Sequence, residues 1–188
     1  MSHYITTYTG VHFEPTNPQP EHIRIKDIAH ALSLICRGNG HVKSFWSVGE
    51  HCICCAKEAA ARGLSRRIVL ACLLHDASEC FMSDIPRPFK QALPEYRERE
   101  DALLDLIYTK YLGSPLSREE QRELKAIDDA LLWYDLKNLL GEAPQGEPPA
   151  IHIDIDYTAR PFADVEKEYL KLFESYSERY SSRTEAAL

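Results

Sequence analysis

An apolar helical run, LACLL, ends in two adjacent polar residues, His75 and Asp76, and Glu79 follows one helical turn after His75. Burying an imidazole and two carboxylates costs several kcal/mol for each unpaired charge unless a partner compensates them. A bound metal cation is the simplest partner for this trio, and a second buried His with a distant Asp would complete its ligand set. His51 and Asp128 supply these two residue types. The sequence therefore favours a fold in which distant segments meet at one polar site inside an apolar interior.

The spacing of apolar residues along the chain predicts helices separated by glycines, prolines and polar loops. We expect six of them, over about residues 27–37, 47–63, 65–80, 95–112, 117–140 and 162–180. Ser47 and Ser117 each precede a Glu by three residues, and these capping boxes open the second and fifth helices. The fold class is all-α, with one domain over residues 1–188, because the length suits one domain and no linker or repeat divides the chain.

Three segments lie outside the predicted helices. Residues 1–25 contain several prolines and are expected to form an extended arm. Apolar and polar residues alternate near residues 150–157, where we expect a short strand or hairpin, or simply extended chain. Residues 182–188 are expected to be a frayed tail.

The charge balance argues against polyanionic partners. The chain carries 29 acidic residues against 22 Lys and Arg, a formal net charge of −7, and no basic cluster. Nucleic acid and anionic membranes are therefore not expected as main partners. The sequence contains no apolar stretch long enough for a transmembrane helix and no signal-peptide pattern at its start, so we expect a cytoplasmic protein.

The six cysteines are expected to be reduced in that compartment. The crowded group of Cys52, Cys54 and Cys55 invites a zinc interpretation. On a helix, however, these three thiols point in different directions, and no second Cys pair stands at zinc-finger spacing. Packing of the thiols as small apolar groups is the favoured interpretation.

The polar residues singled out above fall on apolar helix faces. His51, His75 with Asp76, and Asp128 each share a face with buried-type residues, so three helices would present them inward. Two imidazoles and two carboxylates suit one divalent transition ion, such as manganese, iron, cobalt, nickel or zinc, better than calcium. Any one of these residues alone is equally well explained as a core residue, but the whole set favours a metal site. Asp129 adjoins a proposed ligand, and the apolar stripe favours Asp128 over it.

Four segments extend this pattern well beyond the His-Asp doublet: residues 27–37, 40–51, 73–90 and 124–132. Together they resemble the HD-domain metal-dependent phosphohydrolases, and among these the small bacterial and phage hydrolases related to 5′-deoxynucleotidases. With the intervening helices, the resemblance covers most of residues 5–180. It implies an HD-domain helical bundle.

By position, the resemblance also implies roles for particular residues. The implied metal ligands are His51, His75, Asp76 and Asp128. Glu79 matches an acid that orients or deprotonates the attacking water, and Asp84 matches a carboxyl group that donates a proton to the leaving oxygen. Arg37 and Lys90 match basic residues that hold the substrate phosphate.

Two departures from the family pattern concern the pocket. Gly38 stands where relatives often have a bulky residue that shapes the sugar pocket, so Trp46 or His41 could line it instead, unless Trp46 is a core residue. Residues 133–135, Trp-Tyr-Asp, replace a small residue, Thr and Glu, which could alter the surroundings of the ligands or a contact between subunits.

The expected function is a metal-dependent hydrolase that removes phosphate from deoxynucleoside 5′-monophosphates, small-molecule substrates. One alternative releases triphosphate from nucleoside triphosphates, with Lys43, Arg87 and Lys90 as further cations. Others are a non-catalytic module that binds metal and nucleotide, and a helical scaffold without metal. The aromatic residues of the last helix could pack internally or form a homodimer: Tyr169, Phe173, Tyr176 and Tyr180.

Overall fold

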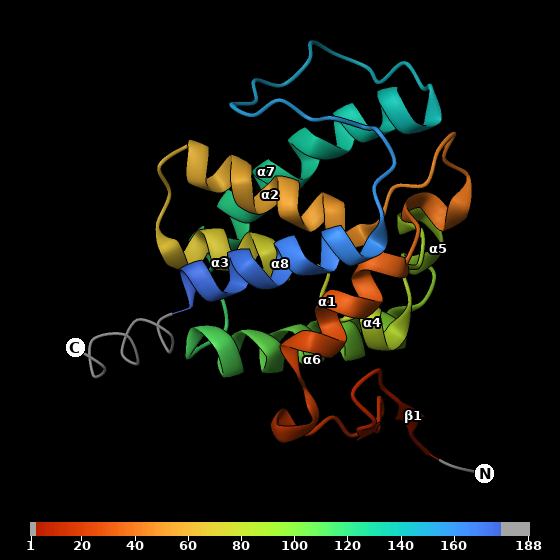
Figure 1. Cartoon of the computed structure of the whole chain (residues 1–188), viewed down its shortest axis with the longest axis vertical. Helices are drawn as coiled ribbons and strands as arrows, with labels where there is room; N and C mark the ends of the chain where they lie inside the picture. The colour runs from red at the N-terminus through yellow and green to blue at the C-terminus, as the bar shows by residue number, and fades with distance from the viewer. Residues whose placement is uncertain (1–2, 178–188) are drawn as a thin grey trace.

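The fold was obtained as a computed structural model, which describes residues 3–177 (Figure 1). Its main helices are α1 (Ile25–Leu34), α2 (Val48–Ala61), α3 (Arg66–Leu74), α6 (Pro94–Leu112), α7 (Arg118–Asp135) and α8 (Phe162–Tyr176). These six correspond to the six helices expected from the sequence. The all-α prediction is confirmed, with one small sheet in addition.

Helices α2 and α3 form the centre of the molecule because most of their residues are apolar and buried. Helix α8 packs across α1, α2 and α3, whereas α7 lies against α2 and α3, and α6 contacts α3 (Figure 1). Tyr169 and Phe173 of α8 are buried in this core, so these two aromatic side chains pack internally. Tyr180 and the expected tail at 182–188 lie outside the described residues.

The capping boxes predicted at the second and fifth helices are confirmed. The Ser47 hydroxyl accepts from the backbone N–H of Glu50 at 3.1 Å, and Ser117 accepts from Glu120 at 3.2 Å. In each box the glutamate accepts from the backbone of the serine in return. These caps set where α2 and α7 begin, and hence which of their side chains face inward.

The small sheet is not where a strand was expected. Strands β1 (Ile5–Thr6) and β2 (His12–Phe13) form an antiparallel hairpin in the arm that was predicted to be extended, with Ile5 opposite Phe13. Near residues 150–157, where a short strand or hairpin, or simply extended chain, was expected, the structure contains no strand, so the first of these alternatives is wrong. The backbone of this segment bonds to helix side chains instead, as when the His152 N–H donates to Glu58 at 2.8 Å.

Two of the helices that end earlier than predicted, α1 and α3, do so beside the site. Helix α1 stops at Leu34 because Cys36 is extended and bridges to Ser47, which leaves Arg37 at the start of the short helix η2 (Arg37–Gly40). Helix α3 stops at Leu74, one residue before the His-Asp pair. The Tyr169 hydroxyl donates to the carbonyl of Leu73 at 2.5 Å, which satisfies one carbonyl freed at this end.

Short elements follow in place of a continuous helix. After a turn come α4 (Glu79–Met82) and α5 (Arg87–Lys90), and α7 continues as the π-helical turn η3 (Leu136–Leu140). Ser83, with φ of 73°, reverses the chain after α4 and so directs the next residue, Asp84, back toward the site. Within residues 3–177, none of the helices has the length and apolar character that crossing a membrane requires.

Candidate metal centre and adjoining pocket

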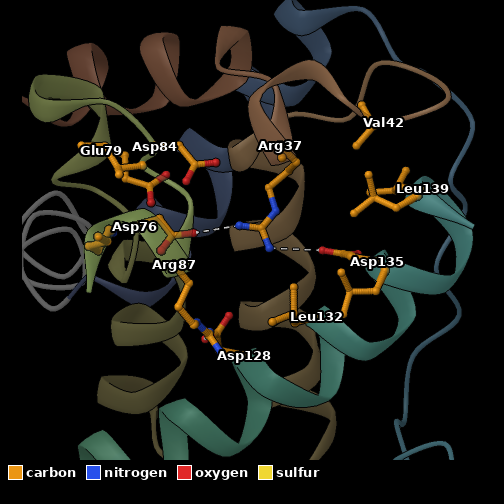
Figure 2. Close-up of a pocket in the computed structure, with 15 residues that line it drawn as sticks. Arg37, Val42, Asp76, Glu79, Asp84, Arg87, Asp128, Leu132, Asp135 and Leu139 are labelled. Atoms are coloured by element: carbon orange, nitrogen blue, oxygen red, sulfur yellow. Dashed lines mark hydrogen bonds and ion pairs between the residues drawn. The ribbon is translucent and has the colours of Figure 1, made fainter. Parts of the chain in front are cut away.

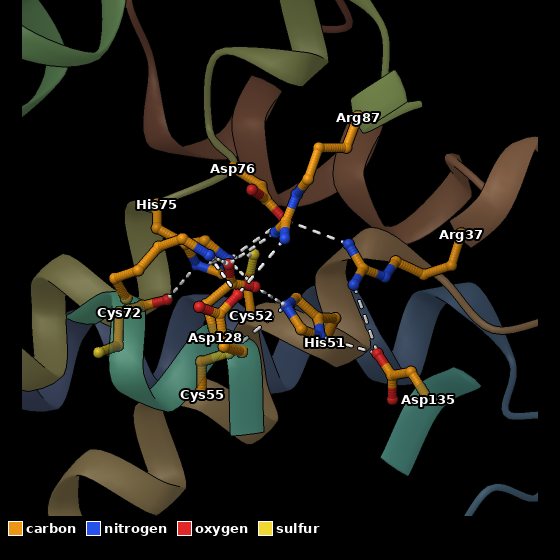
Figure 3. Close-up of polar contacts among 12 residues, drawn as sticks. Arg37, His51, Cys52, Cys55, Cys72, His75, Asp76, Arg87, Asp128 and Asp135 are labelled. Carbon is orange, nitrogen blue, oxygen red and sulfur yellow. Dashed lines mark hydrogen bonds and ion pairs between the residues drawn. The ribbon is translucent and has the colours of Figure 1, made fainter. Parts of the chain in front are cut away.

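The structure brings the four predicted metal ligands together from three parts of the fold (Figure 3). Helix α2 carries His51, the turn after α3 carries His75 and Asp76, and α7 carries Asp128. The Nε2 atom of His51 lies 3.2 Å from Oδ1 of Asp128. The Nε2 atom of His75 lies 3.3 Å from Oδ2 of Asp76 and 3.8 Å from the same Asp128 oxygen. These separations are those of ligand atoms that converge on one point.

Hydrogen bonds on the far side of each imidazole direct its Nε2 atom toward this point. The Nδ1 atom of His75 donates to the carbonyl of Cys72 at 2.8 Å, and Nδ1 of His51 lies 3.0 Å from a carboxylate oxygen of Asp135. Metal-binding histidines are usually fixed in this way by a carbonyl or carboxylate behind the ring. Both rings thus have the orientation that a metal ligand needs.

Two buried polar atoms at the site lack a hydrogen-bond partner within residues 3–177. They are Nε2 of His75 and Oε2 of Glu79. The His75 atom has ion-pair contacts with Asp76 at 3.3 Å and Asp128 at 3.8 Å. A buried polar atom without a partner costs roughly 1–3 kcal/mol, so such atoms in a native fold call for a compensating group. A cation beside Nε2 of His75 would supply a partner there, because this nitrogen can give it an electron pair. The buried His/Cys/Asp cluster can therefore hold a metal ion.

The pKa values of the residues at the site also favour a bound cation. Burial alone would raise the pKa of Asp76, but the His75 ring and the Arg37 guanidinium lower it below its ordinary value. For Asp128, the hydrogen bond with His51 likewise outweighs burial and lowers the pKa. Burial lowers the pKa of His75, yet the Asp76 carboxylate overcomes this and raises it well above its usual range. The carboxylates thus favour positive charge beside them.

The two predicted catalytic acids lie beside this cluster. Glu79 begins α4, and burial followed by repulsion from Asp76 and Asp84 raises its pKa well above the ordinary value. Burial also raises the pKa of Asp84. Carboxyl groups with raised pKa values can hold or exchange a proton near neutral pH, as general acids and bases must.

A pocket of about 260 Å³ opens next to the cluster (Figure 2). Most of its carboxylates lie on one side, whereas Val42, Leu132 and Leu139 lie on the opposite side together with Asp135 (Figure 2). Leu136 and Leu140 also line the pocket. Gly38 also lines the pocket, whereas His41 and Trp46 do not. Trp46 is buried and packs on the Tyr157 ring at 5.0 Å, so it is a core residue.

Arg37 lies between the two sides of the pocket (Figure 2). Its guanidinium nitrogens are 3.5 Å from Asp76 and 3.4 Å from Asp135, and its backbone N–H donates to the Trp46 carbonyl at 2.8 Å. Charge-assisted bonds are normally about 2.7–2.9 Å long, so both ion pairs are loose. Arg37 keeps donor capacity directed into the pocket.

Lys90 lines the same pocket but is more firmly engaged. Its Nζ atom lies 2.7 Å from Oε1 of Glu100, a buried partner that the sequence did not indicate. Arg87 lies at the mouth of the pocket, and 56% of its side chain is exposed. A guanidinium nitrogen of Arg87 lies 3.5 Å from Oδ2 of Asp128. Lys43 does not line it.

The expectation that the cysteines serve only in packing is incomplete. Cys52 and Cys55 are buried, as expected, but both lie against the imidazoles (Figure 3). The Sγ atom of Cys55 is 3.5 Å from Nε2 of His51, and that of Cys52 is 3.9 Å from Nδ1 of His75. The spacing could have indicated the first contact, because residues four apart share a helix face.

Asp135 is one of the residues that could, from the sequence, alter the surroundings of the ligands, but its partners were not predicted. One of its oxygens contacts both His51 and Arg37, and the other accepts from the Tyr157 hydroxyl at 3.0 Å. It lies two helical turns after Asp128 on α7, which is the signal that could have placed it on the inward face.

Two proteins with similar sequences were found. The chain is 32% identical over 148 residues to the uncharacterized protein YfdR of Escherichia coli K12, which covers 72% of this chain and 80% of YfdR. It is also 32% identical over 140 residues to an uncharacterized protein of Rhodobacter capsulatus, with 71% of each chain covered. No model of a known protein family matches the chain.

Proposed function

Because the chain belongs to the family of YfdR, whose name states no activity, we propose its function from the site itself: a metal-dependent phosphohydrolase of the HD-domain type. The substrate we propose is a nucleotide, specifically a deoxynucleoside 5′-monophosphate. The observation that carries the proposal is that a possible two-His, two-Asp metal site shares one pocket with a pair of acids of raised pKa, Glu79 and Asp84.

The ion would be held by His51, His75, Asp76 and Asp128. A divalent transition ion bound there would lower the pKa of a bound water toward neutrality and would polarise a phosphoryl oxygen. This mixed nitrogen and oxygen set suits manganese, iron, cobalt, nickel or zinc.

The remaining roles fall to residues on the pocket wall. Glu79, whose Oε2 atom is buried without a partner among the described residues, orients the attacking water and takes its proton. Asp84 donates a proton to the leaving 5′-oxygen, which would otherwise depart as a poor alkoxide. Arg37 binds the phosphate oxygens through its planar fork, because its existing ion pairs are long and weak. Lys90 attracts the phosphate from its ion pair with Glu100.

The composition of the pocket favours a monophosphate over a triphosphate. Of its three cations, Lys90 is firmly paired with Glu100 and Arg87 lies at the exposed mouth, which leaves Arg37 with donors directed into the pocket. One phosphate group can use these donors, whereas a triphosphate would need further cations. The apolar residues that line the pocket fit the sugar and base.

The acid pair, Glu79 and Asp84, also argues against a non-catalytic module that only binds metal and nucleotide. Binding metal and nucleotide needs neither a proton acceptor for water nor a proton donor for a leaving group. A buried acid, Glu79, and a partly buried one, Asp84, cost stability and are better accounted for by turnover.

Product analysis tests the proposal. Metal-loaded protein is incubated with nucleoside mono-, di- and triphosphates, in deoxy and ribo forms, with His75→Ala as the control. Inorganic phosphate from monophosphates, absent with the variant, supports the proposed activity. Nucleoside together with triphosphate would identify a triphosphohydrolase instead. Equal turnover by wild type and variant would refute the site assignment.

A further inference from the structure

A cysteine thiol faces the proposed ligands from the same helix as His51. Cys55 lies one turn after His51 on α2, and its side chain is buried, with 1% of the residue exposed. Its Sγ atom is 3.5 Å from Nε2 of His51, the nitrogen on the ligand side of that ring. Ligand atoms of His51, Cys55 and His75 all lie within 4.8 Å of one another.

These distances match the edges of a coordination polyhedron. With Zn–S of about 2.3 Å and Zn–N of about 2.0–2.1 Å, adjacent sulfur and nitrogen ligands of a tetrahedral ion are roughly 3.5 Å apart. Nitrogen and oxygen ligands are then roughly 3.4 Å apart. The observed values are 3.5 Å from Cys55 to His51 and 3.2 Å from His51 to Asp128.

The other nearby thiol, Cys52, also lies within 4.8 Å of ligand atoms of His75 and Asp76, but it contacts the other nitrogen of the His75 ring. Cys52 contacts Nδ1 of His75, at 3.9 Å, and that nitrogen already donates to the Cys72 carbonyl at 2.8 Å. The two nitrogens of an imidazole point in different directions, and it is Nε2 of His75 that faces the two proposed aspartate ligands. Cys52 contacts the other nitrogen, Nδ1. Cys52 is therefore a matched control for Cys55: the same residue type, on the same helix, equally buried.

We propose that Cys55 contributes a thiolate ligand to the ion held by His51, His75, Asp76 and Asp128, and that this thiolate makes the site prefer a thiophilic ion such as Zn²⁺ over a hard ion such as Mn²⁺. The inference rests on the metal site of the proposed function and narrows its ion. On binding, an S–metal bond replaces the S–H bond and the proton passes to solvent, with no change of oxidation state. Thiolates select zinc, whereas carboxylates and water suit manganese.

Absorption spectra of the Co²⁺-loaded protein provide the first test. Cobalt gives visible bands in any protein site of this kind, and only a thiolate ligand adds a sulfur-to-cobalt charge-transfer band in the near ultraviolet. We expect this band in the wild type and in Cys52→Ser, and its loss in Cys55→Ser with the visible bands retained. Visible bands without the charge-transfer band in the wild type would overturn the assignment of Cys55 alone. The same holds if the band persists in Cys55→Ser. A wild type that binds no cobalt would overturn the metal site as well.

Metal competition provides the second test. The ratio of Zn²⁺ to Mn²⁺ affinity should fall by about tenfold or more in Cys55→Ser and should not change in Cys52→Ser. The bound is about tenfold because changing even a residue that only hydrogen-bonds to a ligand lowers metal affinity by that much. An unchanged ratio in Cys55→Ser contradicts the proposal. Because a buried hydroxyl can itself destabilise the fold, Cys55→Ala is measured in parallel, and circular dichroism verifies that each variant is folded.

Discussion

Asp135 offers a graded test of how the imidazole of His51 is held. One carboxylate oxygen of Asp135 contacts Nδ1 of His51 at 3.0 Å and Arg37 at 3.4 Å, while the other accepts from Tyr157. Changing the outer-shell partner of a metal-binding histidine typically lowers metal affinity by about 10–100-fold, or about 1.4–2.7 kcal/mol at 1.4 kcal/mol per tenfold.

The two substitutions at this position should fall at opposite ends of that range. In Asp135→Asn the amide oxygen can still accept from His51, and the NH₂ group can donate to the Tyr157 hydroxyl, which rotates to accept. Only the charge is lost, so we expect a loss of about tenfold in metal affinity. Asp135→Ala removes the acceptor as well and leaves His51 free to turn, so we expect a loss of about 100-fold.

The assay is a competition for Zn²⁺ against a chromophoric chelator at fixed pH. Asp129→Asn is the control, because this substitution removes the same charge from a nearby residue of α7. The Asp129 side chain is 49% exposed and pairs with Lys125 and Arg87. Affinities of both Asp135 variants within twofold of the control would refute the argument that Asp135 orients His51.

Four further predictions concern catalysis and stability. Glu79→Gln and Asp84→Asn should each lower kcat by about 10²–10⁴-fold in phosphate-release assays while metal content, measured by mass spectrometry, stays unchanged. Arg37→Lys should raise KM by about tenfold or more, since the second prong of the phosphate contact is lost. Three hydrogen bonds from His152 and Arg62 outweigh burial and lower the pKa of Glu58 below its ordinary value of 4.5. The ionised Glu58 therefore stabilises the folded state above pH 4.5, and this stabilisation is lost as the pH falls through the lowered pKa. Calorimetry should therefore show a smaller acid-induced fall in Tm for Glu58→Gln than for the wild type. Removing metal that is present at 100 times its Kd should cost about 2.7 kcal/mol and lower Tm by roughly 5–10 °C, whereas an unchanged Tm would contradict metal binding to the folded state.

Local signals predicted most of the helices because their causes are local. Ser47 and Ser117 cap helices through bonds to residues three positions on, so the beginnings of α2 and α7 follow from the sequence. The end of α1 does not, because it depends on the bridge between Cys36 and Ser47 across an intervening loop. The alternation of apolar and polar residues near 150–157 was compatible with a strand or with extended chain. A strand also needs a partner strand, and the backbone N–H of His152 bonds to Glu58 instead.

The site was predictable in its membership but not in its surroundings. His51, His75, Asp76 and Asp128 could be named because the sequence pattern predicted that they lie on apolar helix faces, although His75 and Asp76 lie in the turn after α3. The contact of Lys90 with Glu100 and that of Asp135 with His51 join separate elements of the fold, so no periodicity reveals them. The metal-side position of Cys55 depends on which edge of each imidazole is already hydrogen-bonded, which only the assembled structure specifies.

The central claim is that hydrolysis of a phosphomonoester depends on one ion held at the two histidines and two aspartates. The most direct measurement titrates metal into metal-free protein and follows inorganic phosphate released from deoxynucleoside 5′-monophosphates in the same sample. We predict no release without metal and a linear rise that saturates at one ion per chain. Release by metal-free protein, or none from any of these nucleotides by fully loaded protein, would contradict the account.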